Sequence, residues 1–113
     1  MKRNNSIYLD DIINSCEKIL SYVSKSDYES FLGDELLQEF VVRKIEIIGE
    51  ACKSFDKDFL DKHPKFPFRK AISMRNKLTH EYKMIDLETV WSTAQNDIEP
   101  LLKLAKKIRL ELV

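Results

Sequence analysis

Two side chains with useful chemistry stand close together in the segment MRNKLTHEY, residues 74–82. Arg75 can grip two oxygens of a phosphate, and His80 can accept or donate a proton at neutral pH. This pair suits the metal-free cleavage of RNA, in which the 2′-OH attacks the adjacent phosphate. A base takes the hydroxyl proton, and an acid protonates the leaving 5′-oxygen. The reaction needs the 2′-OH and therefore selects RNA over DNA.

Each motif residue also has an ordinary structural interpretation. A histidine at the end of a helix more often caps carbonyl groups than catalyses a reaction, and Tyr82 alone is typical of an aromatic at the edge of a core. General acid–base help is worth about 10²–10⁴ in rate, so one His and one Arg make a slow nuclease unless a dimer adds groups. A metal site is poorly supported, because His63 and His80 are far apart in the sequence and no acid completes a ligand set.

Helical geometry limits which of these side chains can meet. Arg75 and Tyr82 are seven residues apart and share one stripe of a helix, with Thr79 between them. His80 follows Asn76 by four residues and lies on another stripe, about 140° around the axis from Arg75. The Arg and His side chains therefore converge only if the helix ends or bends near Thr79, or if a second subunit completes the site.

The segment around the motif is strongly basic within a chain of zero net charge. From residue 62 to residue 83, seven basic residues face one acid, Glu81, which leaves a formal charge of +6. The seven are Lys62, Lys65, Arg69, Lys70, Arg75, Lys77 and Lys83. Such a patch attracts phosphates, and Arg69, Lys70 and Lys77 are candidate contacts to RNA phosphate. The alternative is an ordinary solvated helix surface, balanced in space by acids on other helices.

Apolar residues repeat every three or four positions along most of the chain, with no strand pattern and no internal repeat. The spacing predicts main helices over about residues 6–24, 34–55 and 67–80, a fourth from Asp86 onward, and short helical turns at 27–32 and in the DFLDKH segment. Pro100 should kink the fourth helix or start a new segment near Glu99. The predicted fold is an all-α, up-and-down bundle of four main helices plus short helical turns, in one domain spanning residues 1–113.

The second long helix has two unusual features. Its apolar residues extend beyond a single stripe, which predicts a central helix or a helix that faces another subunit. Gly49 lies in its middle at a cost of about 1 kcal/mol relative to Ala. A close approach of another helix would explain this glycine.

Cysteine usage and hydropathy indicate where the chain works. The sequence has only two cysteines, Cys16 and Cys52, and no CxxC pair. Both are predicted to be buried thiols in a reducing compartment. The N-terminal MKRNNSIYLDD lacks the apolar stretch of a signal peptide, and no apolar run approaches the roughly 18 residues needed to cross a bilayer. We therefore expect a soluble cytoplasmic protein, and no cofactor is implied.

Several stretches resemble one known family. The pattern RxxxxHxY, formed by Arg75, His80 and Tyr82, resembles that of the HepT-like branch of the HEPN domains. VRKIEIIGEACK is similar to that family's second-helix signature, and FPFRKAISMRNKLTHEY followed by IDLETVW is similar to its third and fourth helices. The resemblance covers nearly the whole chain, from LDDIINSCEKILSYV to IEPLLKL.

The resemblance implies a helical homodimer with two copies of the Arg–His motif lining a cleft at its interface. It also implies a metal-independent ribonuclease toxin, paired with an MntA-like nucleotidyltransferase antitoxin that transfers AMP to the motif tyrosine. By that match, Arg75 and His80 are expected to be catalytic and Tyr82 to be the site of AMPylation. Asn76 is an accessory candidate, because it shares a stripe with His80.

Two residues depart from the family pattern. Glu81 stands where Gly is frequent, and its carboxylate would repel RNA phosphate unless it pairs with Lys77. Phe68 stands where Trp is frequent, which is a mild change. The alternative function is a non-catalytic helical dimer that binds a nucleotidyltransferase or a nucleotide. A structural bundle without any ligand is the third interpretation.

Overall fold

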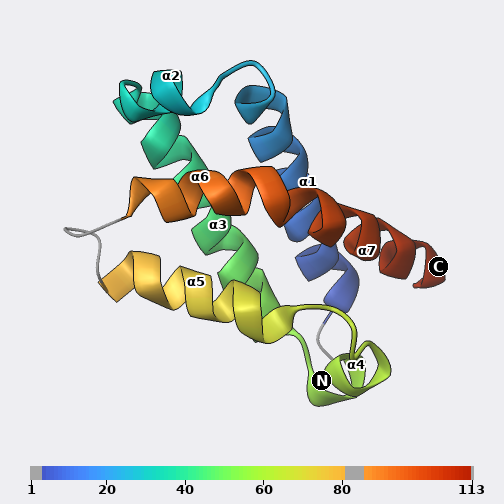
Figure 1. Ribbon diagram of the computed structural model, residues 1–113. Coiled ribbons are helices and arrows are strands. Elements are labelled where there is room, and N and C mark those ends of the chain that lie inside the picture. Colours follow the sequence, from blue (N-terminus) through green and yellow to red (C-terminus); the bar gives the residue numbers. More distant parts are fainter. Residues whose placement is uncertain (1–3, 81–85, 113) are drawn as a thin grey trace.

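Helices account for all the regular secondary structure of residues 4–80 and 86–112, the part of the chain that the computed structural model describes. Within these ranges there are seven helices: α1 (Asn5–Val23), α2 (Tyr28–Leu32), α3 (Glu35–Ser54), α4 (Lys57–Lys62), α5 (Phe68–His80), α6 (Leu87–Asn96) and α7 (Ile98–Glu111) (Figure 1). None of these helices is long and apolar enough to cross a membrane. The prediction of an all-α helical fold is confirmed.

α3 is the central helix of the fold. It packs most extensively against α5 and α1, and it also contacts α2 and α6. In Figure 1, α6 and α7 run one after the other across α1 and α3, while α5 crosses the second half of α3. The broad apolar surface predicted for the second long helix is therefore explained by its central position among the other helices.

Two helix boundaries differ from the prediction. α5 begins one residue after Pro67, whose carbonyl oxygen accepts a hydrogen bond from the N–H of Ala71 at 3.2 Å. The fourth predicted helix is two helices, α6 and α7, which are separated at Asp97. Pro100 is the third residue of α7, where a missing N–H removes no intrahelical hydrogen bond. Of the two outcomes predicted for this proline, the new segment near Glu99 is the one observed.

Aspartate side chains begin four of the helices. Their carboxylates accept backbone hydrogen bonds as helix caps: Asp27 from Ser30 at 2.7 Å, Asp34 from Leu37 at 3.0 Å, Asp56 from Phe59 at 2.9 Å, and Asp86 from Glu88 at 3.0 Å. The backbone hydrogen bond from Ser30 lowers the pKa of Asp27, and the hydroxyl of Thr89 lowers the pKa of Asp86. These caps fix the first residues of α2, α3, α4 and α6.

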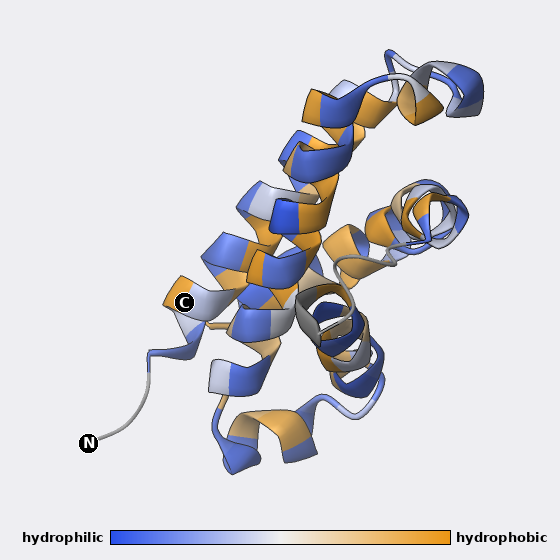
Figure 2. Ribbon diagram, turned by 90° about the vertical axis from the view of Figure 1, so that its left-hand side faces the viewer, coloured by the Kyte–Doolittle hydropathy of each residue, from blue (hydrophilic) through white to orange (hydrophobic). Residues whose placement is uncertain are grey.

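The core is apolar and continuous across α1, α3, α6 and α7. Figure 2 shows hydrophobic turns of these helices facing the interior and hydrophilic turns facing outward. Cys16 and Cys52 are both buried and free, as predicted, and burial raises the pKa of each thiol to about 12. Trp91 is partly buried and packs on buried Phe31 with ring centroids 5.0 Å apart.

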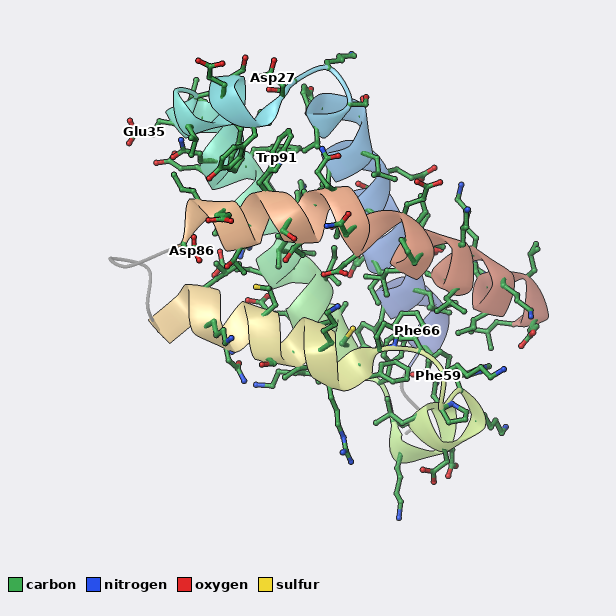
Figure 3. All side chains as sticks on the ribbon, viewed as in Figure 1. Asp27, Glu35, Phe59, Phe66, Asp86 and Trp91 are labelled. Atoms are coloured by element: carbon green, nitrogen blue, oxygen red, sulfur yellow. The ribbon has the colours of Figure 1, made fainter. Side chains whose placement is uncertain are left out.

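A cluster of phenylalanines holds α4 and the segment before α5. Phe55 stacks on Phe59 with ring centroids 4.3 Å apart, and the rings of Phe66 and Phe68 lie 4.4 Å apart. All four side chains are buried. Figure 3 labels Phe59 and Phe66 where α4 and the following linker come close to the main helices. This cluster fixes the direction in which the chain enters α5.

Candidate active site

α5 carries the Arg75 motif and lies unusually close to α3. A Cβ added to Gly49 would lie 2.8 Å from the Cγ of Arg75 and 2.9 Å from the carbonyl oxygen of Ala71, and it would lie closer still to the Cβ of Arg75. Cβ atoms essentially never approach other heavy atoms so closely, so the two helices can meet here only if residue 49 is glycine. The close helix approach predicted from Gly49 is confirmed, and the residue that it meets is the motif arginine.

The Arg75 side chain is held between α3 and its own helix. Its Nη1 donates a hydrogen bond to Oδ1 of Asn76 at 3.0 Å, and its Nη2 lies 3.9 Å from Oε1 of Glu50. The Nε is buried and donates to no acceptor in the described part of the chain, while 22% of the side chain stays exposed. An ion pair of 3.9 Å between partly exposed groups is weak. The guanidinium therefore keeps donors that a phosphate can use.

Asn76 and Glu50 both contact the Arg75 guanidinium, which the sequence did not predict. Asn76 is an accessory candidate because it shares a stripe with His80, but its amide oxygen accepts a hydrogen bond from Arg75. Glu50 is not a candidate from sequence, although it directly follows the glycine that allows the close approach. Its position next to Gly49 in the sequence could have identified it, since a helix that packs onto Gly49 also comes near Glu50.

The remaining motif residues lie at or beyond the end of the described helix. α5 stays helical through His80, so the backbone makes no turn between Arg75 and the histidine. The two backbone positions are then about 140° apart around the helix axis. The side chains of Thr79 and His80, and all of residues 81–85 with Glu81 and Tyr82, lie outside the described part of the chain.

The candidate phosphate contacts on α5 differ in their surroundings. The ammonium of Lys70 lies 3.0 Å from Oδ1 of Asp97, which ties α5 to the junction of α6 and α7. Arg69 and Lys77 are exposed and take part in none of the ion pairs among the described residues. An acid from another helix therefore neutralises Lys70, and Glu50 neutralises Arg75 only weakly. Arg69 and Lys77 keep their full charge toward solvent.

Other chemistry is scarce in the described ranges. They contain no group of three His, Cys, Asp or Glu residues arranged to hold a metal ion. The two buried thiols are poor nucleophiles, because their raised pKa keeps them protonated at neutral pH. What the described residues around Arg75 offer is a rigidly placed guanidinium beside exposed basic side chains, an arrangement suited to binding an anion.

Comparison with known proteins assigns the chain to a family. Residues 12–108 match the family described as "Ribonuclease HepT-like". The match covers most of the chain, which therefore belongs to the HepT-like ribonuclease family. The all-helical structure agrees with this membership, and the resemblance of the motif-bearing segments is confirmed.

Similar proteins occur in both archaea and bacteria. "Putative RNase MJ0125" of Methanocaldococcus jannaschii is 37% identical, with 98% of this chain and 96% of the relative aligned. "Probable ribonuclease HepT" of Thermococcus cleftensis is 39% identical over 96% of this chain and 99% of the relative. "Putative RNase TTE0752" of Caldanaerobacter subterraneus is 39% identical over 89% of this chain and 90% of the relative. No solved structure shows a significant match.

Proposed function

We propose that this protein is a metal-independent endoribonuclease that acts as the toxin of a toxin–antitoxin pair and cuts RNA with Arg75 and His80. Membership of the HepT-like ribonuclease family supports the substrate and the reaction type. The observation that carries the proposal is the position of the Arg75 side chain against α3. A glycine is required to hold this arginine against α3, and its guanidinium is only partly occupied by neighbouring groups.

The chemistry needs one anion-binding group and two proton-transfer steps. Arg75 binds the oxygens of the phosphate and stabilises the negative charge that builds up on them. The 2′-oxygen forms a bond to phosphorus while the bond from phosphorus to the 5′-oxygen breaks. One imidazole takes the proton of the 2′-OH, and a second gives a proton to the 5′-oxygen. The products are a 2′,3′-cyclic phosphate and a free 5′-OH.

A homodimer supplies the second histidine. One chain contributes a single His80, and its backbone position lies about 140° from that of Arg75 on a helix that does not turn between them. Two chains that pair around this part of α5 bring two arginines and two histidines to one cleft. The Asn76 amide orients the guanidinium, and Arg69, Lys70 and Lys77 contact neighbouring RNA phosphates.

An MntA-like nucleotidyltransferase is the proposed antitoxin. It transfers AMP from ATP to the hydroxyl of Tyr82, with release of pyrophosphate and the hydroxyl proton. The modification adds a bulky group and a negative phosphate two residues after His80. That phosphate competes with the RNA phosphate for Arg75, so the modification silences the toxin electrostatically and sterically.

The test is RNA cleavage in EDTA by three purified proteins of verified helical content and intact mass. We expect the wild type to cut total RNA and leave 2′,3′-cyclic phosphate ends. The His80→Ala variant should lose about 10²–10⁴ in rate. Ser73→Ala, which changes an exposed residue on the same helix, is the matched control and should cut normally.

The other results separate the alternatives. An inactive wild type whose mass is raised by one AMP unit or more has been purified in its silenced form and should gain activity when the AMP is removed. An unmodified, folded wild type that leaves RNA intact would contradict the nuclease. It would favour the non-catalytic dimer that binds a nucleotidyltransferase or a nucleotide.

A further inference from the structure

A basic hollow lies away from Arg75, between the linker that precedes α5 and the last turns of α7. It has a volume of about 210 Å³. Three lysines line it: Lys62 at the end of α4, Lys65 in the linker and Lys107 in α7. The apolar side chains of Phe66 and Leu104 are part of its wall. Glu111 is the only acid among the lining residues.

Lys107 differs from the other basic residues of α7 in taking part in none of the ion pairs among the described residues. Lys103 pairs with Glu99 at 3.5 Å, Lys106 with Glu17 at 3.4 Å, and Arg109 with Asp10 at 2.8 Å. None of the ion pairs in the described ranges involves Lys62, Lys65 or Lys107. Lys107 is therefore the basic residue of α7 that forms no ion pair in the described ranges, and it lines the hollow together with Lys62 and Lys65.

The frame around the hollow is rigid. Phe66 is buried in the phenylalanine cluster, and its N–H donates to the carbonyl of His63 at 3.1 Å. The ring of His63 packs on Phe59 with centroids 4.6 Å apart. Lys62, at the end of α4, and Lys65, in the linker, thus extend from backbone that is held by packing and hydrogen bonding. Binding an anion there immobilises the two side chains but does not have to order the chain that carries them.

We propose that this hollow binds a backbone phosphate of the RNA strand, several nucleotides away from the bond that is cut. The proposal rests on the ribonuclease function and adds a second contact site to it. α5 rises about 10 Å between its start and Arg75, so a strand must extend along the helix to reach both places. Exposed Arg69, on the first turn of α5, lies between the hollow and Arg75 along the helix. Ammonium groups interact with the phosphate charge and do not distinguish the bases, so the hollow adds affinity for RNA without sequence preference.

The test measures binding of an RNA strand of about twelve nucleotides whose 2′-hydroxyls are methylated, so that it cannot be cut. Fluorescence anisotropy compares the wild type, Lys65→Gln/Lys107→Gln, and the matched control Lys18→Gln/Lys25→Gln, which removes two exposed lysines elsewhere. The hollow variant should bind about fivefold more weakly per lost phosphate contact near 0.1 M salt. The slope of log K against log salt should fall by about 0.7 per contact.

The Glu111→Gln substitution should change RNA affinity in the opposite direction. Removal of the only lining acid should tighten binding of the same strand by about two- to threefold through the local charge. Circular dichroism confirms that each variant is folded.

Three results would overturn the inference: no loss of affinity in the hollow variant, an equal loss in the control, or no binding of RNA by the wild type. Cleavage of ordinary RNA is measured separately, and this keeps the two proposals apart. If the wild type cuts RNA and the hollow variant binds RNA normally, the ribonuclease proposal stands and the phosphate site in the hollow is contradicted. If the wild type does not cut RNA and the hollow variant binds RNA weakly, the phosphate site stands and the ribonuclease proposal is contradicted.

Discussion

α3 packs against α1 and against α5 in two different ways. On the α1 side, Ile12, Cys16 and Ile19 are fully inaccessible to solvent and belong to the same apolar core as Val41 and Cys52 of α3. On the α5 side, apolar residues such as Ala71 and Met74 also pack against the core, but Gly49 lies directly against the aliphatic part of Arg75. The guanidinium of that arginine lies beside a glutamate, and one of its nitrogens is buried without an acceptor in the described ranges.

The difference shows which contact serves stability and which serves the site. A fully buried aliphatic side chain contributes about 1.5–3 kcal/mol, whereas a buried donor without a partner costs about 1–3 kcal/mol. The Gly49–Arg75 contact therefore places a charge at a local cost in stability, and the buried apolar side chains of the core, those between α1 and α3 included, offset it. The following changes test this division, from the largest expected effect on the free energy of unfolding to the smallest.

Ile12→Ala should have the largest effect on stability. It leaves a cavity between α1 and its neighbours and should lower the free energy of unfolding by about 2–5 kcal/mol. RNA cleavage per folded molecule should stay unchanged, because the change lies on the α1 side of α3. Urea denaturation measures the first quantity. Ile7→Ala, which truncates a side chain of the same helix that is 54% exposed, is the control and should be nearly neutral.

Alkaline pH should weaken the α1–α3 contact through its two thiols. Burial raises the pKa of Cys16 and Cys52 from 9.0 to about 12, so the unfolded chain ionises first and stability is lost as the pH rises from about 9 to 12. The loss should be about 1.4 kcal/mol per thiol for each pH unit in that window. Denaturation at pH 8 and pH 10 measures it. The double variant Cys16→Ala/Cys52→Ala should lose this dependence, and an unchanged slope would contradict the assignment.

Gly49→Ala should damage the site more than the fold. The added methyl collides with Arg75 and with the carbonyl of Ala71, so α5 must shift. Overpacking costs about 1–3 kcal/mol, partly offset by the better helix propensity of Ala, which leaves a net loss of about 1 kcal/mol. Cleavage should fall by about 10²-fold, because a displacement of about 1 Å misplaces the guanidinium.

Gly33→Ala is the matched control for the glycine. A Cβ at residue 33 would meet only the carbonyl oxygen of Ser30, at an ordinary 3.8 Å. Stability and cleavage should therefore both stay close to those of the wild type. If Gly49→Ala and Gly33→Ala cleave RNA equally well, the close approach does not position Arg75.

Glu50→Gln should have the smallest effect on stability. The Arg75–Glu50 distance is long and the glutamate side chain is 48% exposed, so the free energy of unfolding should change by less than about 1 kcal/mol. RNA affinity should rise about two- to fivefold, because a competing carboxylate beside Arg75 has been removed. Glu39→Gln, an exposed acid on the same helix, is the control in the binding assay. Equal affinities of the two variants would show that Glu50 does not compete for Arg75.

Most of the helices were predictable because their signals are local. Apolar spacing marked each long helix, and Asp86 marked the start of α6. The helix boundaries that differ from the prediction lie where one local sequence pattern is compatible with two structures. Pro67 fits either the first residue of a helix or the residue before it, and the apolar stripe around Pro100 does not distinguish a kinked helix from two helices.

The sequence by itself determined the fold class, the family and the residue types suited to the reaction, because these depend on short-range spacing and on motifs. Only the tertiary structure decided that Gly49 meets Arg75, that Glu50 lies beside the guanidinium, and that Lys107 of α7 lines one hollow with Lys62 and Lys65. These residues are far apart along the chain. Their meeting depends on how whole helices pack against α3, and no local pattern in the sequence encodes that geometry.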